Sequence, residues 1–393
     1  MPGRPVSSLR PRDLRRGAVL TLVFLGVLGT AAATGCWDRE DALAPPARAE
    51  GRTGAVGAGY REAVERAAAE AMADGKSGKQ AAEEVVSRSG DRWAVVYDQT
   101  EYAEFEAALD GHYTGVGLWV EAGRDGRIQV SRVQRGGPAD RAGIREGDLV
   151  RSVDGHRVTG LGPARVVGLL RGEADRAVAG TPVVLVLERD GRTRTETLRR
   201  ERLSTEPVTV ERLPDGVLLI KVSAFTKGSG ERVRAAVREA PRGTGVMLDL
   251  RGNRGGLVTE AVTAASAFLD GGLVATYDVR GDQRALYAER GGDTGRPLVA
   301  LVDGGTMSAA ELVTGALQDR GRAVTVGTRT FGKGAVQMPT QLPDGSVAEL
   351  TVGHYRTPAG RSLDGRGINP DLVAADGAEE RARGVLGGLG VAP

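Results

Sequence analysis

Cysteine is nearly absent from this sequence: Cys36 is the only one among 393 residues. One cysteine cannot form an intrachain disulfide or a thiolate zinc cluster, and this one precedes the expected folded body. Thiol redox chemistry is therefore excluded as the basis of function.

The chain also lacks an excess of either charge. Its 53 Lys and Arg nearly balance 51 Asp and Glu, for a formal net charge of +2, and no basic cluster dominates the folded region. We therefore expect no nucleic acid as a partner. Aromatic residues supply only 4% of the chain, whereas 59 residues are glycine. The cores should be built from Val, Leu and Ala, and the fold should be rich in tight turns.

Residues 1–36 have the composition of a targeting segment. Five arginines precede an uncharged apolar run at residues 17–35, and charge returns at Asp38. This pattern predicts export, with the N-terminus in the cytoplasm and the rest of the chain extracytoplasmic. The length of the run fits both a cleaved signal and a membrane anchor, so secretion and membrane attachment stay open. The residues up to Cys36 also resemble a bacterial lipoprotein cleavage box without its usual leucine, which adds a lipid anchor as a third alternative.

Changes of composition divide the rest of the chain. Residues 37–58, rich in Ala, Pro and charge, predict a solvated linker. Residues 59–112 carry apolar side chains at helical spacing and predict a small helical segment. Short Val, Leu and Ile runs between glycine turns predict strands and hairpins over residues 113–203. Residues 204–375 alternate strand-like and helical runs, which predicts an α/β core, and the tail 376–393 has no functional interpretation.

A glycine-bearing loop opens the strand-rich segment at Gly115, Val116, Gly117 and Leu118. Free backbone amides there can receive a carboxylate, although these four residues alone fit an ordinary hairpin turn equally well. Further glycine motifs follow in order: Gly136-Gly137-Pro138-Ala139, Ala142-Gly143-Ile144, Gly147-Asp148 and Val153-Asp154-Gly155. The whole string resembles a PDZ domain of the bacterial protease type. The resemblance implies capture of a polypeptide's free C-terminus as an added strand at a sheet edge.

Ser308 follows a predicted buried strand at residues 298–302 and stands at the start of a predicted helix. The free amides and dipole of a helix N-terminus favour the negative charge that develops beside an acyl-transfer nucleophile. The spacing of Ser308 and Glu311 is also that of a capping box, so helix capping is the alternative.

Lys333 lies between Gly332 and Gly334 in a loop between two strand-like runs. If such a lysine is buried, its pKa falls and the neutral amine can serve as a general base for a serine. Gln337 lies four residues later, a spacing that puts both side chains on one face of an extended chain and lets the amide orient the amine. Surface exposure is the ordinary alternative for an isolated lysine.

A third segment, residues 246–256, predicts a strand followed by a glycine-rich turn before a helix. Amides of such a turn, at Gly255, can form an oxyanion hole together with the amide of Ala309. A plain turn from strand to helix is the alternative.

Together these segments resemble the carboxyl-terminal processing peptidases, also called tail-specific proteases. The matching motifs are Leu248-Asp249-Leu250-Arg251-Gly252-Asn253 with Gly255-Gly256, Ser308-Ala309-Ala310-Glu311, Phe331-Gly332-Lys333-Gly334 with Gln337, Tyr355-Arg356-Thr357-Pro358-Ala359-Gly360 and Gly367-Ile368-Asn369-Pro370-Asp371. The resemblance implies a crotonase-like (ClpP-like) α/β protease core with an inserted PDZ domain. It also implies a serine endopeptidase without cofactor or metal, acting on polypeptides.

The resemblance further implies a role for each site residue. Ser308 is the implied nucleophile, Lys333 the base and Gln337 the residue that positions it, while Gly255 and Ala309 supply the oxyanion amides. One departure is that the family often has serines flanking the nucleophile.

Other functional classes also have partial matches in the sequence. Residues 327–333 almost spell a phosphate-binding loop, but Gly334 stands where a Ser or Thr must reach magnesium. A Ser-His-Asp triad would need one of the three histidines, and only His354 lies in the core segment. A catalytically silent PDZ scaffold that binds exported peptides is the remaining alternative.

Overall fold

The computed structural model describes residues 58–123, 125–172, 178–279 and 282–390. The predicted targeting segment and all of the predicted linker but its last residue lie outside these ranges. Within them, no helix has both the length and the apolar character needed to span a bilayer. The described residues form two compact units, one from residues 112–205 and one from residues 58–111 together with 206–390.

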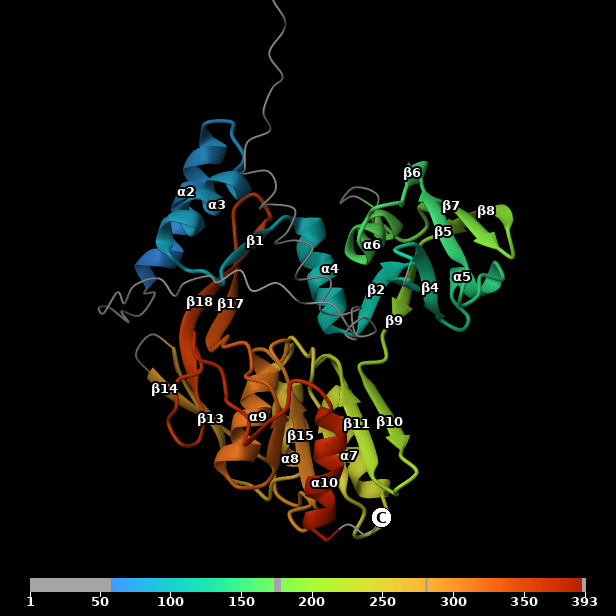
Figure 1. Cartoon of the computed structure of the whole chain (residues 1–393). Helices are drawn as coiled ribbons and strands as arrows, with labels where there is room; N and C mark the ends of the chain where they lie inside the picture. The colour runs from blue at the N-terminus through green and yellow to red at the C-terminus, as the bar shows by residue number, and fades with distance from the viewer. Residues whose placement is uncertain (1–57, 124, 173–177, 280–281, 391–393) are drawn as a thin grey trace, which may run out of the picture. The chain divides into compact units, whose positions relative to one another are not determined.

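The first unit is a β-rich domain. Its strands are β2 (His112–Gly115), β3 (Leu118–Ala122), β4 (Ile128–Val133), β5 (Leu149–Val153), β6 (His156–Arg157), β7 (Pro182–Arg189), β8 (Arg192–Arg199) and β9 (Glu201–Ser204), and its helices are α5 (Pro138–Arg141) and α6 (Pro163–Arg171). The main sheet has the order β3-β4-β5-β7-β8, with β6 paired to β5 (Figure 1). β2 and β9 pair antiparallel, so the chain enters and leaves the domain on neighbouring strands.

Alternation of side chains along β7 builds the core of this domain. Val183, Leu185 and Leu187 are fully buried, whereas the residues between them are less buried. Two-residue periodicity places these three side chains on one face of the sheet, where they pack with Val166 and Leu170 of α6. The predicted strands and hairpins of this segment are thus present.

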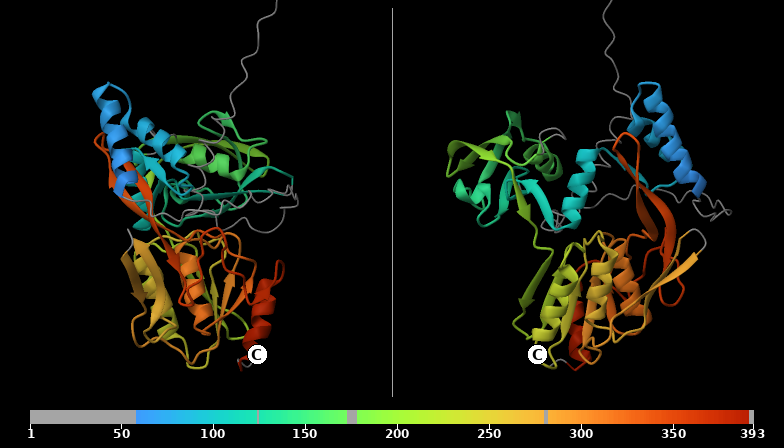
Figure 2. Two further views of the ribbon diagram at one scale, coloured as in Figure 1. Left: turned by 90° about the vertical axis from the view of Figure 1, so that its left-hand side faces the viewer. Right: turned by 180° about the vertical axis from the view of Figure 1, so that it is seen from behind.

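The second unit begins with three helices and a short strand: α2 (Ala58–Ala73), α3 (Gly78–Ser89), β1 (Val95–Tyr97) and α4 (Gln99–Leu109). α2 and α3 lie beside the hairpin of β17 (Ala335–Gln341) and β18 (Val347–Arg356), as Figure 2 shows, and their alanine and valine side chains pack with Leu342, Ala348 and Leu350. β1 pairs antiparallel with β18. The sequence predicted only helices here and missed this strand, because its partner is far away in the sequence.

The core of the second unit is a six-stranded sheet of order β10-β11-β12-β15-β16-β19. Its strands are β10 (Val208–Arg212), β11 (Leu218–Val222), β12 (Val246–Asp249), β15 (Leu298–Val302), β16 (Val324–Gly327) and β19 (Leu372–Val373). All neighbours are parallel except β10 and β11. A second, antiparallel sheet joins β1, β18, β13 (Leu273–Val279) and β14 (Asp282–Tyr287), with β17 paired to β18.

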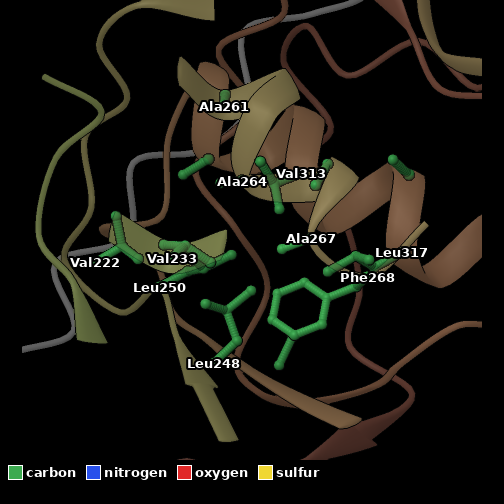
Figure 3. Close-up of a cluster of buried hydrophobic side chains, with 14 of the residues drawn as sticks. Val222, Val233, Leu248, Leu250, Ala261, Ala264, Ala267, Phe268, Val313 and Leu317 are labelled. Carbon is green, nitrogen blue, oxygen red and sulfur yellow. The ribbon is translucent and has the colours of Figure 1, made fainter. Parts of the chain in front are cut away.

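Helices cover both faces of the parallel sheet. α7 (Ser229–Glu239), α8 (Val258–Ser266) and α9 (Ala309–Asp319) pack on one face; Figure 3 shows Val233, Phe268 and Leu317 gathered around Leu248 of β12. α10 (Ala378–Gly388) packs on the other face. The predicted α/β core is therefore confirmed. The tail lacked an interpretation in the sequence, but Ala382 and Leu386 of α10 are fully buried and belong to this core.

Candidate functional site

Three loops meet at the carboxyl edge of the parallel sheet, where β12, β15 and β16 end. Asp303, after β15, accepts the N–H of Gly252, after β12, at 2.9 Å. Met307 donates its N–H to the carbonyl of Asn253 at 2.8 Å. Phe331, after β16, donates its N–H to the carbonyl of Thr306 at 3.0 Å. This edge is where open α/β sheets place their ligands, and all three predicted catalytic segments lie there.

Ser308 caps the N-terminus of α9 with an unusual backbone, φ 55° and ψ −118°. Within the described residues, only Asp154 and Asp190 are other non-glycine residues with a positive φ. An ordinary cap is extended, as at Ser77, which has φ −72° and ψ 120° and accepts the Gln80 N–H through its side chain. A strained conformation of this kind costs about 1–3 kcal/mol and persists where the surroundings enforce it, often at functional sites. Helix capping alone does not account for this backbone.

The surroundings that hold Ser308 centre on Glu311, which is fully buried. Its carboxylate accepts four hydrogen bonds, from the N–H groups of Ser308, Gly332 and Lys333 at 3.0, 2.8 and 2.8 Å and from the Thr330 hydroxyl at 2.6 Å. Burial raises the pKa of Glu311, and these four donors oppose the rise. Four donors on two oxygens match the ionised carboxylate, which accepts only. The Glu311 carboxylate thus bridges Ser308 and the loop that carries Lys333.

Lys333 is largely enclosed, and its Nζ lies 5.5 Å from the centre of the Trp93 ring. Burial lowers the pKa of this amine, opposed by the charges of Glu349, Asp91 and Asp364. A lowered pKa increases the fraction of the amine that is neutral at a given pH. Only the neutral amine can accept a proton as a general base. In the part of the chain that the structure describes, no hydrogen bond joins this amine to the Ser308 hydroxyl. Ser308 and Lys333 are instead linked through their backbone N–H groups, which both donate to Glu311.

Gln337 donates its side-chain N–H to the carbonyl of Trp93 at 2.6 Å. The alternation argument for Lys333 and Gln337 fails, because β17 begins only at Ala335 and its register shifts between Val336 and Gln337. Both side chains nevertheless reach Trp93, one at the ring and one at the backbone. The orienting role of Gln337 stays a prediction.

Gly255 lies directly against the nucleophile. A Cβ on Gly255 would be 3.0 Å from both the Met307 carbonyl oxygen and Ser308 Cβ, and its φ is +99°. Only glycine fits there. However, the Gly255 N–H donates to the Asn253 side chain at 2.9 Å, so it is engaged in this conformation. Ala309 begins α9, where backbone N–H groups lack helical partners. The oxyanion roles of these two amides stay predictions.

The four predicted peptide-binding residues lie at the junction of β2 and β3. Gly115 ends β2 and Leu118 begins β3, which is an edge strand of its sheet. Gly117 has φ +76°, and the buried Val116 accepts the Ala139 N–H through its carbonyl at 3.0 Å. An open strand edge next to a glycine loop fits strand addition, and the role of these residues stays a prediction.

The histidines offer little support for a triad. His354 Nε2 lies 3.8 Å from Asp364, and its side chain is 46% exposed. His112 contacts Ser204 at 3.4 Å, and both belong to the other unit. Within the described ranges, no hydrogen bond joins a histidine to Ser308.

Residues that the sequence did not indicate complete the surroundings of Lys333: Asp91, Trp93, Glu349 and Asp364. Asp91 and Trp93 lie just before β1, and Glu349 lies on β18 opposite Val95. Their approach depends on pairing between distant segments, for which no local pattern exists.

Comparison with known proteins fits this site. Residues 216–374 match peptidase family S41, and residues 129–189 match a PDZ domain. The chloroplastic carboxyl-terminal-processing peptidase 3 of Arabidopsis thaliana is 35% identical over 313 residues, 75% of this chain and 59% of that protein. The carboxy-terminal processing protease CtpA of Bacillus subtilis is 32% identical over 289 residues, 72% and 61% of the two chains.

This chain covers a larger share of two further relatives. The carboxy-terminal-processing protease of Bartonella bacilliformis is 31% identical over 302 residues, 72% of this chain and 68% of that protein. The solved photosystem II D1 C-terminal processing protease has 31% identity and a TM-score of 0.50, covering 76% of this chain and 82% of that one. The chain spans about three fifths of the length of the first curated relatives. By these matches, the chain belongs to the carboxyl-terminal processing peptidases of family S41 and carries a PDZ domain.

Proposed function

We propose that this protein is an exported serine endopeptidase that cleaves polypeptides near C-terminal tails, using Ser308 as nucleophile and Lys333 as general base. The observation that carries the proposal is the buried Glu311, whose carboxylate binds the N–H groups of both residues. A structural cap would need neither the strained serine backbone nor a buried lysine amine on the adjoining loop.

The proposed reaction needs no group beyond the protein and water. The neutral Lys333 amine takes the Ser308 hydroxyl proton while Oγ forms a bond to the carbonyl carbon of the substrate. The resulting ammonium then gives that proton to the leaving nitrogen as the peptide bond breaks, which leaves an acyl-enzyme. The amine next takes a proton from water, whose oxygen attacks the ester, and returns that proton to Ser308. Peptide hydrolysis is complete and the enzyme is regenerated.

We assign the oxyanion hole to the amides of Gly255 and Ala309 and the positioning of the amine to Gln337. The Gly255 N–H is held by Asn253 in this conformation, so binding of a substrate carbonyl requires this amide to turn from the asparagine to the substrate. The core that carries these groups is proposed to be crotonase-like.

We assign capture of the substrate to the PDZ domain. A free C-terminus would pair with the edge of β3, with its carboxylate on the amides of the loop Gly115, Val116, Gly117 and Leu118. The names of the relatives fit a substrate that is processed at its carboxyl terminus. The composition of the N-terminal segment supports the proposal of an extracytoplasmic location. The protein would be anchored there by a retained helix or by a lipid on Cys36, or it would be secreted.

An experiment with matched peptides tests this function. An unstructured polypeptide with a free C-terminus and the same polypeptide with an amidated C-terminus are incubated with the parent enzyme and with Ser308→Ala, and products are mapped by mass spectrometry. We expect the parent to cleave the free form with a KM at least about tenfold lower than for the amidated form, and the variant to cleave neither. An inactive parent that still binds the free C-terminus would instead identify a silent PDZ scaffold.

A further inference from the structure

Strand β3 has an open edge that a further strand can join. It pairs with β4 on one side and stands at the end of its sheet. Gln134 donates its N–H to the Gly117 carbonyl at 2.9 Å, and the bonds of an antiparallel ladder alternate, so the backbone N–H and C=O of Leu118 point away from β4. These two groups lie where an added strand would bind.

The side chains of β3 divide between the two faces of the sheet. Leu118 and Val120 pack into the core of the domain together with side chains of α6. Trp119 and Glu121 alternate with them and therefore lie on the outer face, where both are half-buried. A strand added at the open edge would present every second side chain to this outer face.

An arginine lies over the tryptophan on the outer face. Arg132 of β4 is opposite Trp119 in the register, and its guanidinium carbon lies 3.7 Å from the centre of the indole ring. Stacking of this kind holds the planar guanidinium over the ring. Arg132 is exposed, and among the residues that the structure describes no carboxylate pairs with it. The outer face thus carries a positioned positive charge next to the open edge.

A carboxylate lies on the same face two residues further along β3. Glu121 accepts the side-chain N–H of Gln129, which is opposite it in the register, at 2.7 Å. In the described part of the domain, no basic side chain forms an ion pair with Glu121. The outer face therefore carries positive charge at Trp119 and negative charge at Glu121, separated by about 7 Å along the strand.

The carboxylate of a captured tail determines which of its residues meet these two charges. With the carboxylate on the amides of the loop that ends at Leu118, the terminal residue pairs its backbone with Leu118. The penultimate residue of an antiparallel tail then lies opposite Trp119, and the fourth residue from the end lies opposite Glu121. Residues opposite each other on neighbouring strands share a face, so both tail side chains point to the outer face.

We propose that the open edge of β3 selects polypeptide tails with an acidic penultimate residue and a basic or neutral residue in the fourth position from the end. The inference rests on the capture of C-termini proposed above and names the class of tail that is captured. Neighbouring strands lie about 4.8 Å apart, so the long side chain of a penultimate glutamate reaches along the Trp119 ring to the Arg132 guanidinium. An acid in the fourth position meets the like charge of Glu121, which weakens binding.

Two peptides of the same composition test the proposal. One ends in Lys-Ala-Glu-Ala and the other in Glu-Ala-Lys-Ala, so the two charges exchange positions while the net charge stays the same. Dissociation constants are measured by fluorescence anisotropy with the full chain carrying Ser308→Ala, which prevents cleavage. We expect the first peptide to bind about tenfold more tightly, because an exposed ion pair changes affinity by up to about fivefold and both positions change sign. Equal affinities, or tighter binding of the second peptide, overturn the proposal.

Charge variants assign the preference to the two side chains. Arg132→Glu should abolish the preference, and Arg132→Glu combined with Glu121→Lys should reverse it by about tenfold. A variant that only disturbs the fold would weaken both peptides alike and could not reverse the order. Arg192→Glu makes the same charge change on β8, at the other end of the sheet, and should keep the full preference. A preference that survives Arg132→Glu overturns the proposal.

Glu121→Lys alone is the second variant, in case Arg132→Glu does not fold. It should also abolish the preference, because a lysine in the fourth position then meets a like charge. An unchanged preference in this variant overturns the proposal as well.

Binding and cleavage together separate this inference from the proposed function. The expected preference in Ser308→Ala, combined with a parent enzyme that cleaves no polypeptide, supports the charge selection and refutes the peptidase mechanism. Cleavage by the parent, combined with equal affinities for the two peptides, supports the peptidase and overturns this inference. Binding of neither peptide overturns both the selection and the capture of C-termini by the PDZ domain.

Discussion

The Glu311 carboxylate accepts the backbone N–H of Lys333 at 2.8 Å, although the two residues lie on different elements of the core. The same oxygen accepts the N–H of Ser308. One buried acid therefore sets the geometry of the nucleophile and of the loop that carries the proposed base.

Glu311→Gln should impair both stability and catalysis. The amide offers one acceptor oxygen and turns two donors toward a site that already has four. We expect the free energy of unfolding to fall by ~2 kcal/mol, as for a buried group left unsatisfied. Displacement of the Ser308 backbone should lower kcat roughly 100-fold. Urea unfolding and steady-state kinetics measure the two effects.

Glu260→Gln is the matched control for this variant. Glu260 accepts the N–H groups of Gly228 and Gly230 at the start of α7, away from the serine. It should lose ~1 kcal/mol of stability while kcat is unchanged. Equal kcat values for the Glu311 variant and this control would contradict a role of Glu311 in the site.

Gly255→Ala should place a methyl group against the nucleophile. The new Cβ would lie 3.0 Å from Ser308 Cβ and 3.1 Å from the Ala309 nitrogen, at a φ of +99°. We expect a loss of roughly 1–3 kcal/mol of stability from backbone strain and a fall in kcat of about 100-fold. Gly243→Ala also has a positive φ, +80°, but its Cβ would meet nothing within 4 Å. Comparable kcat losses in the two variants would refute the steric argument.

Burial of Lys333 should make stability depend on pH in the alkaline range. Its pKa in the folded protein is lowered, whereas an unfolded lysine has a pKa of about 10.4. Between these two values the unfolded chain binds more protons, so the free energy of unfolding rises with pH. Lys333→Met removes this contribution. The free energy of unfolding of the parent minus that of Lys333→Met should rise as the pH increases toward about 10 in urea unfolding, and a value that does not change with pH would show that the amine is solvated.

Glu349 gives the opposite dependence near neutral pH. Its folded pKa of about 7 is above the unfolded value of about 4.3. The contribution of this carboxyl is fully favourable below about pH 4 and is lost as the pH rises through 7. Glu349→Gln should therefore match the parent at pH 4 and exceed its stability by up to roughly 3.7 kcal/mol at pH 8, the equivalent of the difference between the two pKa values. Thermal unfolding at the two pH values checks this, and a less stable variant at pH 8 would show a favourable ion pair instead.

The sequence predicts the site better than it predicts the surroundings of the site. Ser308, Lys333 and Gly255 follow buried parallel strands, and the carboxyl ends of such strands meet at one edge of a sheet regardless of sequence separation. Local patterns therefore suffice to bring these loops together. The helix α9 begins at the predicted residue, Ala309, because a helix start depends on its local sequence.

Trp93 and Glu349 could not be found in this way. Neither residue belongs to a motif that can be recognised in its own segment. Their approach to Lys333 depends on the antiparallel pairing of β1 with β18. The register shift beside Gln337 is likewise invisible in the sequence and invalidates the spacing argument, while the contact of Gln337 with Trp93 gives that residue a different link to the lysine.

The most direct test of the account compares the parent with Lys333→Met on an unstructured polypeptide at saturating substrate. The methionine keeps the volume and burial of the side chain but cannot accept a proton. We expect kcat to fall at least about 100-fold while the variant stays folded and still binds a free C-terminal peptide. Cleavage by Lys333→Met at the rate of the parent would contradict the Ser-Lys mechanism.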